Sequence, residues 1–111
     1  MHAWFASVVI PTLETWVVEV AHEVVALLVI DEGWIDQLYV DPQHVGGGLG
    51  SCLVDIAKRQ SRGNLDLWTF QSNVGARRFY ERHGFVVVAT TEGNNEESAP
   101  DMRYHWDTAR T

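Results

Sequence analysis

The spacing of hydrophobic and polar residues along the 111-residue chain predicts a run of strands followed by an alternation of helices and strands. Short runs rich in β-branched residues, separated by turn residues, are typical of an antiparallel meander. The chain has three such runs in succession, at residues 15–21, 24–30 and 34–40. The segment before them, residues 1–13, places apolar residues at helical spacing up to Pro11, so we expect a short helix there.

The third run departs from strict alternation. Its apolar residues Ile35, Leu38 and Val40 cannot all face one side of a regular strand. One extra residue near Asp36 or Gln37 would bring them to the same face, so we expect a β-bulge at that point.

The rest of the chain alternates between helical and strand-like patterns. Apolar residues recur at helical spacing over residues 48–60, and again over residues 73–82, where Asn73 is the expected N-cap and Gly84 the stop. The expected strands are residues 65–70, 85–91 and 101–106, and the last two would form a hairpin around an acidic loop. Only the two strands joined by the first helix can readily be parallel, because that crossover is long enough.

Composition and charge narrow the classes of function. A hydrophobic content of 46 % with five Trp supports one packed domain over residues 1–111. The longest apolar stretch is too short to cross a bilayer and the N-terminus lacks a signal peptide, so we expect a cytoplasmic protein without a membrane partner. The net charge of −7 argues against nucleic acid and suits a cationic acceptor such as an amine.

Cysteine and histidine usage gives no sign of a metal or a disulfide. The five His are scattered along the chain without the short paired spacing of a metal site, so no metal is expected. The lone Cys52 excludes an internal disulfide. It stands beside the apolar stripe of the helix at residues 48–60, where we expect it to be a small buried hydrophobe.

A glycine-rich segment between the third strand and the first helix carries the main chemical signal. Its glycines leave successive backbone N–H groups uncovered at a helix N-terminus, which favours the binding of a phosphate or pyrophosphate. A nucleotide-hydrolase phosphate loop is excluded because no Lys lies between Met1 and Cys52, and the dinucleotide fingerprint has a different glycine spacing. A tight turn that packs the helix on the sheet, with no ligand, is the alternative.

Two segments resemble signatures of the GNAT superfamily of N-acetyltransferases. The first is Gln43-x-x-Gly46-x-Gly48 after a strand that ends Leu38-Tyr39-Val40-Asp41-Pro42, and it resembles the acetyl-coenzyme A loop of that family. The second is Asn73-Val74-Gly75-Ala76-Arg77-Arg78-Phe79-Tyr80-Glu81-Arg82-His83-Gly84-Phe85, with Asn, Ala, Tyr and Gly-Phe at the family's intervals. The resemblance runs from about Thr15 to the C-terminus. It implies the α/β GNAT fold, a mixed and mostly antiparallel sheet with a splayed parallel pair and helices on both faces.

The resemblance also implies a role for each matching residue. Acetyl-CoA would place its pantetheine arm along the third strand, where one backbone N–H polarises the acetyl carbonyl, and its pyrophosphate on the glycine loop. Tyr80 would donate a hydrogen to the departing thiolate. The cofactor-binding residues so implied are Leu38, Tyr39, Val40, Gln43, His44, Val45, Gly46, Gly47, Gly48, Leu49, Gly50, Ser51, Asn73, Ala76, Phe79 and Tyr80.

A general base is also needed, because only a neutral amine can attack the acetyl carbonyl. Asp36 on the third strand is the first candidate and Glu32 the second. Four other acidic residues could instead attract the charge of the acceptor, namely Glu92, Glu96, Glu97 and Asp101. For each of these carboxylates the ordinary alternative is a solvated surface group. The large aromatic residues Trp34, Trp68 and Trp106 are expected in the core rather than in an acceptor-binding cage.

These implications give an expected function and one alternative. The expected function is direct transfer of acetyl from acetyl-CoA to the amine of a small molecule or peptide, without a covalent enzyme intermediate. The alternative is a module that binds acetyl-CoA but has no catalytic activity.

The chain departs from the family pattern at its beginning. Relatives usually have a strand and two helices before the region equivalent to Thr15, and those helices form one wall of the acceptor site, whereas only residues 1–14 precede it here. Residues 15–21 would then be an unpaired edge of the sheet. Because residues 4–10 are also apolar enough to need a partner surface, we expect a homodimer.

Overall fold

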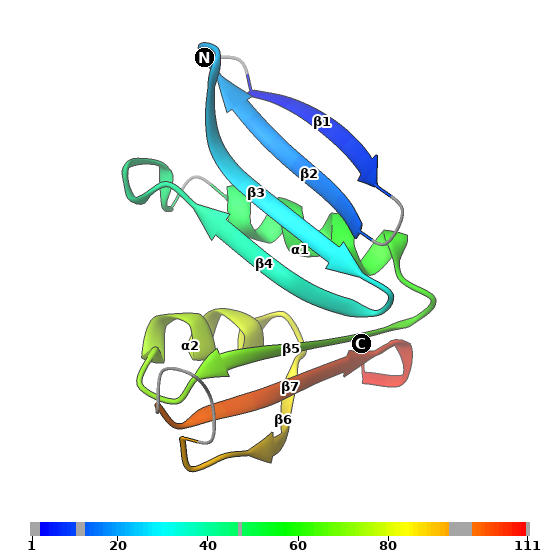
Figure 1. The fold of residues 1–111 in the computed structure, drawn as a ribbon, viewed down its shortest axis with the longest axis vertical. Coiled ribbons are helices and arrows are strands. Elements are labelled where there is room, and N and C mark those ends of the chain that lie inside the picture. Colours follow the sequence, from blue (N-terminus) through cyan, green and yellow to red (C-terminus); the bar gives the residue numbers. More distant parts are fainter. Residues whose placement is uncertain (1–2, 11–12, 47, 94–98, 111) are drawn as a thin grey trace. The chain divides into compact units, whose positions relative to one another are not determined.

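The computed structural model describes residues 3–10, 13–46, 48–93 and 99–110, and its chain divides into two compact units. The first unit is residues 1–62 and holds the strands β1 to β4 and the helix α1 (Figure 1). The second is residues 63–111 and holds β5 to β7 and α2. The expectation of a single domain over the whole chain stays a prediction. Among the described residues, no helix has the length and apolar character needed to cross a membrane.

The first unit is an antiparallel meander of four strands. In chain order these are β1 (Ala3–Ile10), β2 (Leu13–Val20), β3 (Glu23–Asp31) and β4 (Trp34–Val40). The helix expected over residues 1–13 is therefore wrong, because β1 pairs with β2 along its whole length. A nearly continuous apolar run fits a helical and a strand pattern equally well, so periodicity alone could not decide between them. The expected unpaired edge at residues 15–21 is also wrong, since β1 covers it.

Both later hairpins of the meander close through two-residue turns with positive φ. Ala21 and His22 have φ of 51° and 68°, and Glu32 and Gly33 have φ of 42° and 90°. Positive φ at both central residues is the mark of a type I′ turn, whose twist matches that of the flanking strands. The hairpin predicted around His22 and Glu23 is confirmed, with the turn placed one residue earlier.

The predicted bulge in β4 is confirmed at Asp36. Val29 of β3 is paired with Gln37, whereas the next residue, Ile30, is paired with Ile35, so Asp36 is the extra residue. The bulge brings the apolar residues of β4 to the side of the sheet that faces the core, as the sequence pattern required.

Helix α1 (Leu49–Gln60) contacts β3 and β4 and covers one face of this sheet (Figure 1). Its buried residues Leu53, Val54, Ile56 and Ala57 pack over the buried β3 residues Ala26, Leu28 and Ile30. Cys52 is exposed, so the expectation that it would be buried is wrong. It lies at the margin of the inward stripe, beside a cavity of about 450 Å³ that is also lined by Trp16 and Ile56.

The second unit is a three-stranded antiparallel sheet with one helix. Its elements are β5 (Asn64–Phe70), α2 (Val74–Arg82), β6 (Val86–Thr90) and β7 (Asp101–Asp107). The central strand β7 pairs with both β5 and β6, which confirms the predicted C-terminal hairpin. A short 3₁₀ turn, η2 (Thr108–Arg110), follows β7.

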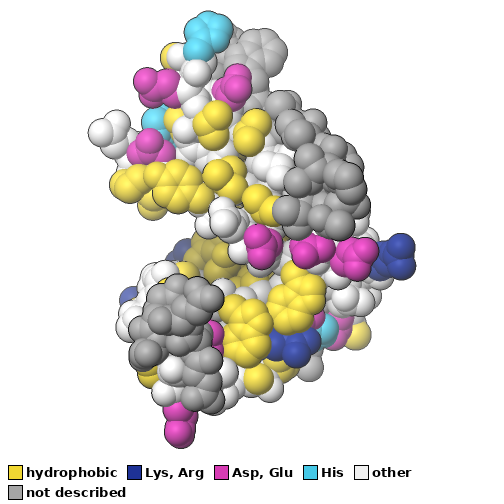
Figure 2. Space-filling view, in the orientation of Figure 1, with side chains coloured by type: hydrophobic (Ala, Val, Ile, Leu, Met, Phe, Trp, Pro, Cys, Tyr) yellow, Lys and Arg dark blue, Asp and Glu magenta, His cyan; other side chains and the backbone are white. Residues whose placement is uncertain are grey.

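The core of the second unit explains where its tryptophans lie. Leu65 and Leu67 of β5 are buried with Tyr104 and Trp106 of β7, so the expected core position of Trp106 is confirmed. Trp68 points to the other face and is 46 % exposed, which makes its expected core position wrong. The physical reason is alternation along β5, since Trp68 is paired with Arg103 rather than with a buried residue. Figure 2 shows hydrophobic side chains beside Lys or Arg on the visible face of this unit.

Candidate active site

The glycine-rich loop of the first unit is anchored at its start by hydrogen bonds of Asp41. The Asp41 N–H donates to the Val25 carbonyl at 2.7 Å, which ties the loop to β3 directly after β4 ends. The Asp41 carboxylate accepts from the Gln43 N–H at 2.9 Å and caps the 3₁₀ turn η1 (Pro42–His44). The loop therefore leaves β4 in a fixed direction.

Helix α1 begins without a side-chain hydrogen bond that caps its first turn. Its N-cap is Gly48, with φ of 84°, and Gly46 has φ of 92°, a left-handed region that glycine adopts without strain. A Cβ atom at either glycine would meet no other atom within 4 Å. Tight packing, the alternative reason for these glycines, is therefore not what requires them. The space above the loop is open to a ligand.

The backbone at this helix start is suited to an anion. The first intrahelical hydrogen bond is donated by the Cys52 N–H to the Gly48 carbonyl at 3.0 Å, so the N–H groups of Leu49 and Gly50 precede the helical ladder. The first turn holds no acidic residue that would repel a phosphate. Backbone N–H groups and the positive end of the helix dipole together form a phosphate site.

The other loop residues differ in exposure. Val45 is 69 % exposed and Gln43 is exposed, whereas His44 is half-buried. The His44 Nδ1 atom is enclosed and has no hydrogen-bond partner among the described residues. Gly47, which the sequence also assigned to the cofactor, lies outside the described residues.

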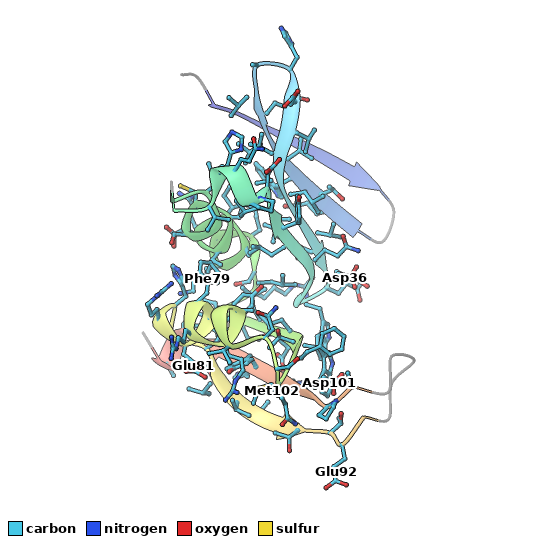
Figure 3. All side chains as sticks on the ribbon, turned by 90° about the vertical axis from the view of Figure 1, so that its left-hand side faces the viewer. Asp36, Phe79, Glu81, Glu92, Asp101 and Met102 are labelled. Carbon is cyan, nitrogen blue, oxygen red and sulfur yellow. The ribbon has the colours of Figure 1, made fainter. Side chains whose placement is uncertain are left out.

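The side chains of Asp36 and of residues 38–40 on β4 range from half-buried to exposed. Leu38 and Val40 are half-buried, while Tyr39 is 50 % exposed. The candidate base Asp36 is exposed at the bulge and is labelled in Figure 3. The second candidate, Glu32, lies in the turn before β4.

In the second unit, both ends of α2 are capped by residues of the second sequence signature. The Asn73 Oδ1 atom accepts from the Ala76 N–H at 3.1 Å, which confirms Asn73 as the N-cap. This bond uses the oxygen of the side chain and leaves its NH₂ group to donate elsewhere.

At the other end, Gly84 has φ of 87°, the Gly84 N–H donates to Glu81 at 3.2 Å and the Phe85 N–H donates to Tyr80 at 3.1 Å. This is a Schellman motif, and its usual hydrophobic contact is made by the Tyr80 and Phe85 rings, whose centroids are 5.6 Å apart.

Tyr80 is thereby held in a fixed position. The residue is 8 % exposed, and its ring also packs against Phe79 and Tyr104 at centroid distances of 5.2 and 6.3 Å. Burial raises the pKa of Tyr80 to about 12. The neighbouring Tyr104 hydroxyl donates to the Glu81 carboxylate at 2.6 Å, whereas the Tyr80 hydroxyl has no such partner among the described residues. Tyr80 therefore keeps a protonated hydroxyl available to a ligand.

The contacts that hold α2 to the hairpin of β6 and β7 could not be predicted from the sequence. The Gln71 side chain donates to the carbonyls of Thr91 and Asp101 at 3.0 and 3.2 Å, and the Arg77 guanidinium donates to the Gln71 carbonyl at 3.1 Å. Figure 3 shows Phe79 and Glu81 leaving α2 on opposite sides. Glu81 bonds to β7, so Phe79 is left on the side away from that contact.

The acidic residues proposed to attract the acceptor are not equivalent. The Asp101 carboxylate accepts a hydrogen bond from the Thr91 hydroxyl and so belongs to the hairpin. Glu92 is exposed at the start of the loop (Figure 3), while Glu96 and Glu97 lie outside the described residues. Among the described acidic residues of this loop, only Glu92 has the exposure that long-range attraction of a cation needs.

A second polar cluster, also missed from the sequence, lies on the face of the sheet that carries Trp68. Buried Asp66 accepts from the Arg103 Nε at 2.6 Å and is 2.9 Å from the His105 Nδ1. The His105 Nε2 is 2.9 Å from Asp107. The hydrogen bond with Asp66 raises the pKa of His105, against the effect of burial. The cluster satisfies a buried carboxylate and holds β5 to β7.

Known proteins resemble this chain in sequence over part of their length. An uncharacterized N-acetyltransferase of Methanocaldococcus jannaschii is 35 % identical over 63 residues, which are 53 % of this chain and 28 % of the relative. An uncharacterized N-acetyltransferase of Escherichia coli is 30 % identical over 76 residues, 68 % of this chain and 47 % of the relative. The chain thus spans less than half the length of these curated relatives.

Solved structures share the fold. Nourseothricin acetyltransferase has a TM-score of 0.78 at 20 % identity, over 88 % of this chain and 66 % of that one. A putative streptothricin acetyltransferase from Bacillus anthracis, in complex with acetyl coenzyme A, has a TM-score of 0.77 at 19 % identity, over 87 % of this chain and 63 % of that one. These likenesses confirm the predicted α/β fold. The family model of the acetyltransferase (GNAT) domain matches residues 11–87, and the chain therefore belongs to the GNAT family of acetyltransferases.

Proposed function

We propose that this chain is an acetyl-CoA-dependent N-acetyltransferase that transfers acetyl directly to an amine. The observation that carries the proposal is the start of α1. There, two glycines with open space above them follow β4, and the helix begins without a side-chain cap. In this proposal the backbone from Gln43 to Ser51 holds the pyrophosphate, and the β4 backbone from Leu38 to Val40 holds the pantetheine arm.

Acetyl-CoA supplies the thioester whose carbonyl carbon the amine attacks. A β4 backbone N–H donates to the carbonyl oxygen as negative charge develops on it. The C–N bond forms, the C–S bond breaks, and the Tyr80 hydroxyl donates a hydrogen bond to the sulfur that leaves as a thiolate. The nitrogen gives up its extra proton, and the thiolate takes up one proton, so that the products are the amide and coenzyme A. Asn73, through its free NH₂ group, and the side chains of Ala76 and Phe79 complete the cofactor side of the site.

The amine reaches the acetyl group as an ammonium ion and must lose a proton before it attacks. We assign this step to Asp36, because its carboxylate is exposed and is displaced from the regular alternation of β4 by the bulge. The acceptor is an amine of a small molecule or a peptide. An acidic protein attracts such a cation, and Figure 2 shows Asp and Glu side chains on the visible face of the first unit.

For the cellular setting we propose the cytoplasm, where thiols such as that of Cys52 remain reduced. For assembly we propose a homodimer. Residues 15–21 do not form the unpaired edge expected from the sequence, because β1 covers them. Among the described residues β1 and β6 are edge strands, and β1 is the one that covers β2.

The experiment that tests the cofactor site compares thermal unfolding with and without acetyl-CoA. Binding at a hundredfold excess over the dissociation constant adds about 2.7 kcal/mol of stability to the wild-type chain. Gly50→Asp places a carboxylate in the first turn of α1, where it repels the pyrophosphate but suits the helix dipole. Gly50→Asn is the neutral control of the same size. We expect the acetyl-CoA shift to persist with Asn and to be lost with Asp, while the unliganded Asp variant remains stable.

Catalysis is tested separately, by release of coenzyme A in the presence of a panel of amines. Thiol release that depends on one amine supports the enzyme. Binding of acetyl-CoA with no release for any amine supports the alternative, a binding module. No shift of the wild-type melting curve in millimolar acetyl-CoA would contradict the cofactor site.

A further inference from the structure

The cavity of about 450 Å³ in the first unit lies at the side of α1 that borders β2. Helix α1 packs over β3 and β4, so the next strand, β2, lies at the margin of the helix. One wall of the cavity is Trp16 of β2. The other wall is a stripe of α1 whose members are three or four residues apart, and the described residues on it are Cys52, Asp55, Ile56, Arg59 and Gln60. A cavity of this size is within the range of small-molecule sites, about 300 to 1,000 Å³.

The two largest side chains of the cavity give it apolar walls. Trp16 is half-buried, and its indole N–H donates to the Glu14 carboxylate. Because that bond occupies the only polar group of the side chain, the ring presents an apolar surface to the cavity. On the opposite wall, Ile56 is 8 % exposed. The space between Trp16 and Ile56 therefore suits an aromatic or aliphatic group of a ligand.

Two charges of opposite sign line the same cavity. Asp55 and Arg59 are both exposed and are four residues apart, which makes their side chains neighbours on the helix, with Cβ atoms about 5 to 6 Å apart. This spacing would allow the two to pair with each other, yet neither has a hydrogen bond or an ion pair with a described residue. The cavity therefore offers one carboxylate and one guanidinium beside an apolar surface.

We propose that this cavity binds a free α-amino acid with a large apolar side chain. The ammonium group of the ligand pairs with the Asp55 carboxylate, and its carboxylate pairs with the Arg59 guanidinium through charge-assisted hydrogen bonds. The apolar side chain of the ligand packs between Trp16 and Ile56. A ligand with only one of the two charges would leave one protein group unpaired and would bring a like charge beside it.

The site is independent of the proposed function. None of the described residues that line the cavity is among those assigned to acetyl-CoA or to the amine acceptor. The chemistry also differs from that of the glycine loop, whose backbone N–H groups suit an anion. Binding of the amino acid can therefore be measured on the chain without acetyl-CoA.

The test is a titration of the wild-type chain with three ligands, followed by NMR at the Trp16 indole N–H and at the backbone amides of α1. The ligands are L-phenylalanine, phenethylamine, which lacks the carboxylate, and 3-phenylpropionate, which lacks the ammonium group. We expect a dissociation constant of about 0.1 to 5 mM for L-phenylalanine, as is usual for a ligand of this size. Each analogue should bind about 3- to 30-fold more weakly.

Two variants identify the charges, and both change exposed residues. Arg59→Gln should weaken L-phenylalanine and 3-phenylpropionate by about 3- to 30-fold and should not weaken phenethylamine, which has no carboxylate. Asp55→Asn should weaken L-phenylalanine and phenethylamine by a similar factor and should not weaken 3-phenylpropionate.

The matched controls are Arg62→Gln and Glu23→Gln, which remove the same charges from exposed residues of the first unit that do not line the cavity. Neither should change the affinity for any of the three ligands. The inference is overturned if L-phenylalanine at tens of millimolar shifts neither the Trp16 signal nor those of α1, or if both analogues bind as tightly as L-phenylalanine. It is also overturned if either cavity variant weakens all three ligands equally, or if the controls weaken L-phenylalanine to the same extent.

Discussion

The helix cap uses the ring of Tyr80 but not its hydroxyl, which is the only polar group of the side chain. The ring packs against Phe85 in the Schellman motif, and the hydroxyl is left to a ligand. A thiol has a pKa of about 8.5, so full proton transfer from a tyrosine with a pKa of about 12 would be uphill by about 5 kcal/mol. In the proposed reaction, Tyr80 would therefore donate a hydrogen bond to the thiolate rather than transfer its proton fully.

We predict that Tyr80→Phe lowers turnover by about ten- to a thousandfold while the affinity for acetyl-CoA stays nearly unchanged. The phenylalanine ring keeps the contact with Phe85, so the cap survives. Tyr104→Phe is the matched control, because it removes a hydroxyl that is already bonded to Glu81 and should reduce stability without reducing turnover. The measurement is steady-state kinetics under conditions in which the chemical step is shown to be rate-limiting. Wild-type turnover in both variants would contradict the role of Tyr80.

His105 gives the second unit a pH-dependent stability. Its pKa is raised by the hydrogen bond with Asp66, so folding favours the protonated imidazole. This contribution is fully present below the unfolded-state pKa of about 6.5 and is lost as the pH rises through the higher folded-state value. We predict that the wild-type chain exceeds His105→Gln in melting temperature most at about pH 5.5, and by less at about pH 8.5. A difference that is the same at both pH values would show that the charge of His105 plays no part.

At the scale of the element, α2 explains why its sequence signature is recognisable. Asn73 caps the start of α2, Gly84 ends the helix in the left-handed conformation, and Phe85 packs against Tyr80. Each of these positions has a local physical reason, which is why the helix and both of its ends could be predicted from sequence.

Two glycines of this segment should respond oppositely to alanine. Gly84→Ala forces a Cβ into the left-handed region and should destabilise the chain by about 1 kcal/mol. Gly75→Ala should stabilise it by up to about 1 kcal/mol, because Gly75 has ordinary helical φ and the new Cβ would meet only the Asn73 Oδ1 at 4.0 Å. Urea unfolding of the two variants measures both changes. A loss of stability in Gly75→Ala as large as that in Gly84→Ala would refute this account of the helix end.

The turn between β2 and β3 stores strain that a substitution can remove. Ala21 and His22 both have positive φ, which Ala tolerates poorly and for which Asn-Gly is the preferred pair in a two-residue hairpin turn. We predict that Ala21→Asn combined with His22→Gly raises the free energy of unfolding by about 1 kcal/mol. Thermal unfolding at neutral pH measures this, and an unchanged or lowered midpoint would contradict the strain.

The prediction of elements from sequence failed where tertiary pairing decides. Residues 3–10 form a strand because β2 supplies hydrogen-bond partners along their whole length. The sequence of residues 3–10 by itself does not indicate that pairing. The bulge at Asp36 could be predicted because its cause lies within one strand. Within the candidate site, the glycine-rich loop and the two caps of α2 could be predicted from the positions of Gly and Asn in the sequence. The polar contacts of Asp66, Gln71 and Arg77 were not, because each joins residues distant in sequence or depends on side-chain direction.

At the scale of the whole molecule, the edge strand β1 is where we propose that the homodimer assembles. Among the described residues β1 pairs only with β2, and its eight residues carry no charge and no proline. An edge of this kind readily pairs with another strand. We predict that light scattering gives twice the monomer mass of 12.5 kDa at micromolar concentration, and that Ala6→Lys, a charge placed on the edge, restores the monomer. A wild-type mass of 12.5 kDa would contradict the homodimer.

The caps of α2 also limit what the second sequence signature, residues 73–85, indicates about the activity of a protein that carries it. Asn73, Gly84 and Phe85 maintain the folded shape of the segment, so selection for stability alone would preserve them in a lineage that had stopped acetylating anything. In such a lineage the hydroxyl at position 80 could be lost without disturbing the cap, because a Phe side chain would keep the ring contact with Phe85. The presence of this signature in another sequence therefore indicates a stable helix, and the hydroxyl at position 80 is the part of it that the helix cap does not require.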